Sequence, residues 1–207
     1  PPPDDGHGRR LGARSDARSL LGHEERLLLM RRAAQSGMSL IEILIAIAIV
    51  GIVFALGMPA YGTWIQNTQI RTASDSILAG LQVAKNEAIR RNAPIQFKLD
   101  GGATTQWRVN PFLDPDGTPI QSRSADEGSP NATITLTPAD ADTVTFSALG
   151  RVIPNADASP TLAQVDIDNP RIAVVADRRT LRMLIPPGGA LRLCDPKVAP
   201  GDPRSCY

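Results

Sequence analysis

Histidine is almost missing from this sequence, since its two copies, His7 and His23, both precede residue 37. The rest of the chain therefore has no imidazole for acid–base catalysis, for a Ser–His or Cys–His nucleophile pair, or for the usual zinc sites. This absence argues against an enzyme, and the sequence predicts no catalytic residue, no metal site and no cofactor.

Cysteine is equally scarce, and its two copies, Cys194 and Cys206, lie close together near the C-terminus. One pair is compatible with a single disulfide in an oxidising compartment, and also with two free thiols in a cytosolic tail. The disulfide is favoured because an earlier segment looks directed to a membrane. A loop of this length stabilises a fold by roughly 3 kcal/mol in the chain-entropy model.

Charged residues are absent from one long stretch, residues 43–70. Residues 43–58 are almost wholly apolar, and residues 38–41 extend the run to roughly 20 residues, enough for a helix to cross about 30 Å of hydrocarbon. The sequence therefore predicts a transmembrane helix over residues 38–60.

The residues on either side of this helix predict its orientation. Arg26, Arg31 and Arg32 precede it, and by the positive-inside rule they place the N-terminus in the cytoplasm. Tyr61 and Trp64 follow it, where aromatic side chains mark the outer interface of a membrane. The remainder of the chain would then lie outside the inner membrane.

Three alternatives compete with a processed membrane helix. A buried core helix is one, although an uninterrupted run of this length is more typical of a membrane. A secretory signal peptide would need a shorter apolar stretch and a small-residue cleavage site, and no convincing site follows Met58. A plain signal anchor fits every feature except Glu42.

Glu42 is a charge near the start of the apolar helix. A carboxylate there costs free energy, by roughly 2.5–3.5 kcal/mol for Asp at mid-bilayer and less near the interface. Chance retention, with the side chain reaching the headgroups, is one explanation. The other is a partner: if the chain is cut after Gly37, Met38 gains a free α-amine that could pair with Glu42 of a neighbouring subunit. That pair would offset the burial and set the axial register of a helical assembly.

Residues 37–46 read Gly-Met-Ser-Leu-Ile-Glu-Ile-Leu-Ile-Ala and resemble the type IV prepilin signature. The signature has a cut-site Gly, usually a Phe, then Thr or Ser, Leu, Ile or Val, and Glu before an apolar helix. Met38 replaces the usual Phe, and the processing enzymes of this family tolerate other apolar residues there. The resemblance implies that a prepilin peptidase cuts between Gly37 and Met38 and N-methylates Met38, and that Glu42 acts in assembly.

The resemblance brings two further expectations. Pro59 is similar to the helix-loosening positions of pilins, and it removes one backbone hydrogen bond, which predicts a kink. Residues 1–37 would form the leader peptide. Because typical leaders are much shorter, residues 1–29 are interpreted as disordered and as either a misread start or a tolerated extension.

Apolar residues at helical spacing predict an amphipathic continuation of the helix over residues 61–93, ended by Asn-Ala-Pro at 92–94. Residues 81–92 read Leu-Gln-Val-Ala-Lys-Asn-Glu-Ala-Ile-Arg-Arg-Asn and resemble the L-x-x-A-R-x-E-A-I-x-R-x region of the GspH/FimT family, with Lys85 replacing the common Arg. That family comprises the minor pseudopilin H of type II secretion and the minor pilin T of type IV pili. The expected apolar stripe is Ile70, Ala73, Ile77, Leu81, Ala84 and Ala88.

After Pro94 the pattern changes to period two, which predicts short strands separated by turns. Residues 114–117, Asp-Pro-Asp-Gly, superficially resemble a calcium loop but lack the later ligands of an EF-hand, so they are interpreted as a turn. A long helix followed by many strands predicts an α+β, pilin-like fold, with the helix packed on an antiparallel sheet in a head of residues 94–207. The expected strands are residues 95–99, 106–109, 133–137, 143–147, 164–167, 171–175, 180–185 and 190–194.

The FimT branch of the family is associated with DNA capture through a basic motif, roughly Gly-Arg-x-Arg, before the first Cys. Residues 189–194 read Gly-Ala-Leu-Arg-Leu-Cys, so Arg192 matches the second Arg and Ala190 replaces the first. Several cations together would bind phosphates in a salt-sensitive way without base readout. A solvated basic face is the alternative, and interleaved acidic residues favour it. The other candidate DNA contacts are Arg178, Arg179 and Arg182.

Two functional hypotheses follow, and an unprocessed, membrane-anchored periplasmic protein is a third. In the first, the chain is a structural minor subunit of a type II secretion pseudopilus or a type IV pilus. In the second, it is a DNA-binding minor pilin for DNA uptake in natural transformation. The resemblance implies an inner-membrane protein with one span and a periplasmic head, which later joins the filament. The expected partners are the prepilin peptidase, other pilins or pseudopilins, the inner-membrane assembly platform, membrane lipid and, in the second hypothesis, DNA.

Overall fold

The computed structural model describes residues 37–206, so the interpretation of residues 1–29 falls outside it. The chain divides between Ala55 and Leu56 into two units, which are described separately. One helix, α2 (Leu40–Arg91), ends the first unit and begins the second. Its helical assignment is continuous through Pro59, and the kink there stays a prediction.

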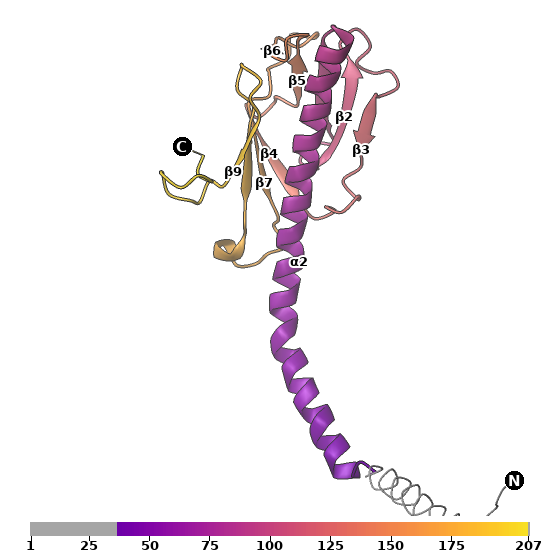
Figure 1. Cartoon of the computed structure of the whole chain (residues 1–207), viewed down its shortest axis with the longest axis vertical. Helices are drawn as coiled ribbons and strands as arrows, with labels where there is room; N and C mark the ends of the chain where they lie inside the picture. The colour runs from indigo at the N-terminus through magenta and orange to yellow at the C-terminus, as the bar shows by residue number, and fades with distance from the viewer. Residues whose placement is uncertain (1–36, 207) are drawn as a thin grey trace, which may run out of the picture. The chain divides into compact units, whose positions relative to one another are not determined.

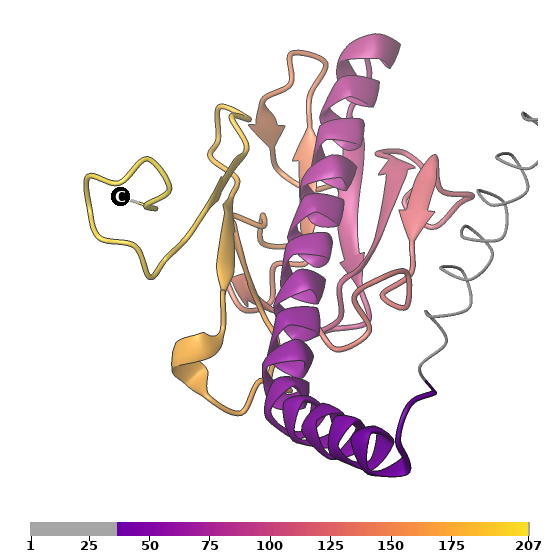
Figure 2. The ribbon, with the colours of Figure 1, turned by 60° about the horizontal axis from the view of Figure 1, so that its bottom comes forward.

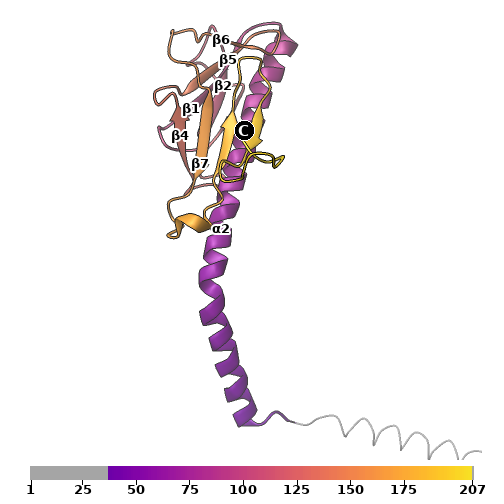
Figure 3. The ribbon, with the colours of Figure 1, turned by 90° about the vertical axis from the view of Figure 1, so that its left-hand side faces the viewer.

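In the second unit, α2 lies along one side of the strands (Figures 1 and 3). All six residues of the expected apolar stripe, from Ile70 to Ala88, have an exposed fraction of 0%, which confirms the stripe. The helix ends in a Schellman motif, in which the N–H of Asn92 bonds Ile89 O and the N–H of Ala93 bonds Ala88 O. Asn92 adopts a φ of 49°, a left-handed conformation that Asn tolerates, and Pro94 follows it.

The strands form two antiparallel sheets, so the α+β class is confirmed. The first sheet has the order β3-β2-β1-β5-β6 and the second the order β4-β7-β8-β9. Figure 2 shows α2 crossing in front of both groups of strands. Their bounds are β1 Ile95–Asp100, β2 Gln106–Pro111, β3 Gln121–Arg123, β4 Thr133–Thr137, β5 Thr143–Phe146, β6 Val152–Ile153, β7 Gln164–Asp168, β8 Leu181–Leu184 and β9 Arg192–Cys194.

Gly80 is the point at which the backbone of α2 meets the aromatic part of the first sheet. A Cβ at this position would lie 2.7 Å from Phe97 Cε2 and 2.9 Å from the Trp107 ring. Trp107 is 2% exposed, and its indole N–H donates to Ser76 Oγ over 2.8 Å, so the buried polar atom is satisfied. A glycine here therefore allows the helix to rest directly on two aromatic rings.

Three parts of the expected strand pattern were wrong or missed, and the other strands are confirmed within a few residues. The strand expected over residues 171–175 is a turn that leads into a short 3-10 helix, η1 (Val175–Asp177). Its apolar residues suggested a buried strand, but most of them are exposed. Strands β3 and β6 were missed because they are only three and two residues long and carry no alternating apolar pattern.

Candidate functional site

The residues expected to act in processing and assembly lie at the start of α2. Gly37 and Met38 precede the helix, and Glu42 lies in its first turn, where a carboxylate meets the positive end of the helix dipole. The backbone N–H groups of Glu42 and Ile43 donate to Ser39 O at 3.0 and 3.2 Å. Among the residues that the structure describes, no atom lies within 4 Å of the position of a Cβ at Gly37.

A long band of exposed apolar side chains follows Glu42 along α2. The large apolar residues between Ile43 and Trp64 are 44% to 78% exposed. Among the described helices, α2 is the one that is long and apolar enough to cross a membrane. Tyr61 and Trp64 lie at the end of the band, and their rings stack with centroids 5.9 Å apart. A surface of this kind needs a lipid or a partner helix to cover it.

Lys85, in the segment that resembles the GspH/FimT family, connects α2 to the loops that contain Gly189 and Gly150. Its Nζ donates to Gly189 O over 2.9 Å. A Cβ at Gly189, where φ is +74°, would lie 2.0 Å from Gly150 O, so the two glycine turns touch. Lys85 therefore fixes this pair of turns against α2.

Glu87, in the same segment, forms ion pairs along the helix. Its carboxylate lies 2.5 Å from Arg90 Nη2 and 2.7 Å from Arg91 Nε. The hydrogen bond from Arg90, followed by that from Arg91, lowers the pKa of Glu87 below its ordinary value of 4.5. Glu87 is thus ionised at neutral pH and engaged within the last turns of the helix.

The four arginines proposed as DNA contacts are placed on the second sheet and on the turn before it. Arg178 Nη1 lies 3.1 Å from Asp168, and Arg182 Nε lies 2.6 Å from Asp166. Arg192 Nη2 donates to Ser205 O over 2.6 Å, and Arg179 is exposed. The charges of Arg178 and Arg182 are therefore largely balanced by neighbouring carboxylates. The order of charges along the sequence did not predict these two ion pairs.

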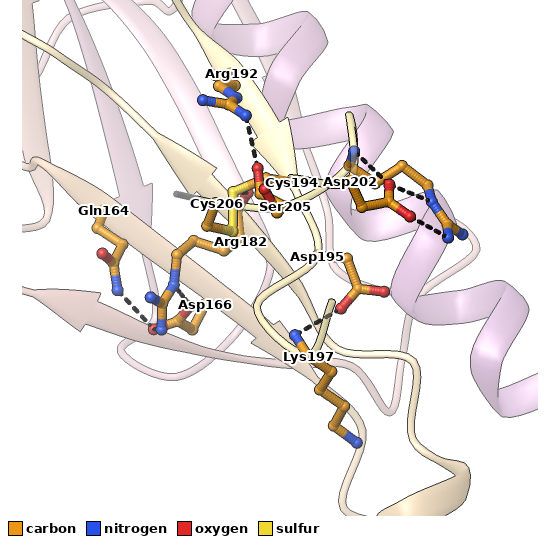
Figure 4. The surroundings of a disulfide bond; sticks show 11 residues. Gln164, Asp166, Arg182, Arg192, Cys194, Asp195, Lys197, Asp202, Ser205 and Cys206 are labelled. Atoms are coloured by element: carbon orange, nitrogen blue, oxygen red, sulfur yellow. Dashed lines mark hydrogen bonds and ion pairs between the residues drawn. A yellow bond between two sulfur atoms is a disulfide. The ribbon is translucent and has the colours of Figure 1, made fainter. Parts of the chain in front are cut away.

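Cys194 and Cys206 are joined in a disulfide that closes the C-terminal loop over β9. The N–H of Asp195 bonds Arg204 O over 2.8 Å, and Asp195 forms an isolated bridge with Ser205. Figure 4 shows Arg182 and Asp166 on one side of the disulfide and Arg192 directed towards Ser205 on the other. Arg192 thus binds the C-terminal loop. The resemblance of residues 189–194 to the basic motif of the FimT branch did not predict this structural role.

A groove of about 560 Å³ lies between α2 and this loop. Its walls include Trp64 and Arg71 from α2, Leu193 from β9, and Asp195 and Arg204 from the loop. Across residues 37–206 no three His, Cys, Asp or Glu side chains lie close enough together to hold a metal ion. Within the described range, the groove therefore has no set of metal ligands.

The comparison with protein families decides the identity of the head. The family described as "Type II transport protein GspH" matches residues 73–189, more than half of the chain. The chain belongs to the GspH family. The "Prokaryotic N-terminal methylation motif" matches residues 32–58, which contain Gly37, Met38 and Glu42.

Individual proteins similar to this GspH-family chain are pilins. The "Type IV major alpha-pilin" of Moraxella bovis is 45% identical over 47 residues, which cover 23% of this chain and 30% of that protein. The chain therefore matches less than a third of the length of that relative. Two crystal structures of the type IV minor pilin FimU from Pseudomonas aeruginosa are 17% and 18% identical, with TM-scores of 0.47 and 0.44. They cover 67% and 66% of this chain and 95% and 99% of FimU.

Membership of this family carries a general function. Pilins and pseudopilins are structural subunits rather than enzymes, and the methylation motif implies processing by a prepilin peptidase and assembly with other pilins. This GspH-family chain therefore carries a prokaryotic N-terminal methylation motif and, in α2, an apolar helix long enough to cross a membrane.

The contact of Lys85 with Gly189 predicts a measurable loss of stability in a Lys85→Met chain. Methionine keeps much of the aliphatic length but cannot donate to Gly189 O, and a hydrogen bond to a charged group contributes about 1.5 kcal/mol to stability. Urea unfolding of the full chain in detergent should show a decrease of about that size. Lys85→Arg, which restores the common family residue, should unfold near the wild-type midpoint. Equal midpoints for all three chains would contradict the role.

Proposed function

We propose that this chain is a minor pseudopilin of a type II secretion system, cut by a prepilin peptidase after Gly37 and N-methylated at Met38. The observation that carries the proposal is the placement of Gly37, Met38 and Glu42 at the start of an exposed apolar helix that leads into a GspH-family head. The family description, a type II transport protein, supports secretion over pilus assembly.

The apolar helix would hold the subunit in the inner membrane, with the N-terminus in the cytoplasm and the head in the periplasm. The arginines before Gly37 support this orientation, because basic residues flank the cytoplasmic end of membrane helices. An assembly platform in the inner membrane would then transfer the helix from lipid into the filament, where apolar helices of other subunits cover it. Glu42 would pair with the α-amine of a neighbouring subunit, and Pro59 would loosen the helix.

A Gly37→Arg chain is expected to remain unprocessed. Position 37 is exposed, and no described atom lies within 4 Å of a Cβ there, so we expect the substitution to leave the head folded and to act on the approach of the peptidase backbone. Co-expression with a prepilin peptidase and mass spectrometry of the purified chain should show a cut, methylated Met38 in the wild type and the uncut form in the variant. A mature band of normal size in Gly37→Arg would contradict the assignment of the cut site.

A deletion strain separates the secretion system from the pilus. Under the proposal, loss of the gene reduces the extracellular activity of secreted enzymes and leaves surface pili and twitching motility unchanged. Complementation with the wild-type chain should restore secretion, and complementation with Gly37→Arg should not. Loss of pili with normal secretion would assign the chain to a type IV pilus instead.

DNA uptake has less support as a function, because Arg178 and Arg182 are paired with carboxylates and Arg192 binds the C-terminal loop. A gel-shift and salt titration of the full chain in detergent, beside an Arg192→Ala control, tests it directly. We expect little binding of duplex DNA at low salt. Binding that weakens steeply with salt and is lost in Arg192→Ala would favour a DNA-uptake minor pilin.

A further inference from the structure

The segment between β7 and β8 exposes adjacent apolar side chains on the surface of the head. Residues 173–176 read Ala-Val-Val-Ala, and Val174 and Val175 are 56% and 63% exposed. Helix η1, which begins at Val175, has no buried residue. Residues 171–179 are called the valine loop below. Adjacent apolar side chains that lie outside the core of the head indicate a surface that contacts a membrane or another protein.

Hydrogen bonds from the side chain of Asn67 give the valine loop a defined position beside α2. Asn67 Nδ2 donates to Asp177 O over 2.9 Å, and Asn67 Oδ1 accepts the N–H of Arg179 over 2.8 Å. From the C-terminal loop, Lys197 Nζ donates to Val175 O and Arg178 O over 2.9 and 2.7 Å. Backbone groups of the turn are thus bound by the head, while the valine side chains remain exposed.

The attachment at Asn67 sets the level of the valine loop along the helix. Asn67 follows Trp64 by about 4.5 Å, at about 1.5 Å of rise per residue. Trp64 and Tyr61, each 62% exposed, end the apolar band in the second unit, and such aromatic side chains favour the boundary between hydrocarbon and headgroups. Figures 1 and 3 both show the η1 turn, in gold, beside α2 at the end of the head where the helix enters it. The backbone of the valine loop is therefore attached to α2 within about two turns of the aromatic pair.

The charges around the valines match a phospholipid surface. Arg171 and Arg179 flank the apolar residues, and both are exposed. Asp177 is the acid within the loop, while Arg178 is directed to Asp168. Apolar side chains beside arginines are the combination that partitions into the headgroup region and binds lipid phosphates.

We propose that the valine loop docks on the outer surface of the bilayer that the apolar helix crosses. Val174 and Val175 enter the headgroup region, and Arg171 and Arg179 bind lipid phosphates. This second contact fixes the tilt of the head on the membrane while the subunit awaits assembly, and it is lost when the helix leaves the bilayer. The inference rests on the proposed membrane anchoring of α2.

Spin-label depth measurements on the full chain test the docking. Val175→Cys is labelled in vesicles of phosphatidylethanolamine and phosphatidylglycerol at a low ratio of protein to lipid, and Val174→Cys is a second labelled site in the loop. The matched control is Leu149→Cys, an aliphatic position that is 82% exposed. It adjoins Gly150, which packs on Lys85, about 27 Å further along the helix than Asn67. Ile49→Cys, in the apolar band, reports whether the helix itself is inserted.

The ratio of collisions with oxygen to collisions with a water-soluble nickel chelate should be several-fold higher at positions 174 and 175 than at 149. Labels at 174 and 175 that are as accessible to the chelate as the label at 149 would overturn the docking, and would leave the valines for contact with a neighbouring subunit. A deep label at position 49 in that result would keep the anchoring itself. If the label at 49 were also in water, the proposed membrane anchoring would fail, and the docking with it.

Discussion

A chain carrying Glu42→Gln is expected to enter the membrane and be cut after Gly37, yet to be missing from assembled filaments. Glutamine has nearly the same shape as glutamate but no charge, so insertion becomes easier rather than harder. Under the proposed pairing, the variant leaves the α-amine of the neighbouring Met38 without a counter-charge, and an unpaired buried charge costs about 3–5 kcal/mol. Immunoblots of the sheared filament fraction and the membrane fraction should show incorporation reduced by at least about tenfold.

Glu42→Asp is the matched control for this experiment. Aspartate keeps the charge on a side chain one methylene shorter, so we expect more incorporation than with glutamine. Filaments that contain the Gln chain at the wild-type level would show that Glu42 has no partner in assembly and that its side chain only reaches the headgroups. Glu42 is exposed in the first turn of α2 in the single chain, so the two variants test whether the assembled filament supplies a partner for its carboxylate.

Gly80→Val should have the largest effect on the stability of the head. A Cβ at position 80 would lie 2.7 Å from Phe97 and 2.9 Å from Trp107. Both rings are buried, on strands β1 and β2 of the first sheet. Overpacking of a core costs about 1–3 kcal/mol, and we expect about 3 kcal/mol or a failure to fold because two rings would have to move. Urea unfolding of the full chain in detergent, followed by near-ultraviolet circular dichroism, measures the loss.

Gly62→Val controls for the change from glycine to a β-branched residue within the same helix. Position 62 has no atom within 4 Å of a Cβ, so only helix propensity changes there. We expect its free energy of unfolding to stay within about 0.5 kcal/mol of the wild type. If Gly80→Val unfolded at the same midpoint as Gly62→Val, the close approach of the helix to the rings would not limit stability.

The parts of the fold that the sequence predicts are those governed by periodicity. Ile77 and Leu81 belong to a stripe with helical spacing, and both are fully buried under the strands. The end of the helix was equally clear, because Pro94 cannot continue it and Asn92 tolerates the left-handed conformation. These signals are local, so neighbouring residues alone determine them.

The parts that the sequence did not predict depend on contacts between distant residues. Val174 and Val175 have the composition of a strand, but Asn67 and Lys197, far away in the chain, bind the backbone of this segment in a turn. The apparent basic cluster is similar, because Arg182 pairs with Asp166 on the neighbouring strand. A count of charges along the sequence includes both residues but does not show that they form an ion pair.

The disulfide loop over β9 also bears on how the head behaves at high protein concentration. Strand β9 is an edge strand of its sheet. The free backbone groups of an uncovered edge strand can pair with a strand of another molecule. The Arg192–Ser205 and Asp195–Arg204 hydrogen bonds occupy this border with the chain's own C-terminus. Reduction of Cys194–Cys206 would therefore release the loop and expose the edge strand β9 to pairing with another molecule. Intermolecular strand addition, and hence aggregation, should follow before the helix-covered core unfolds.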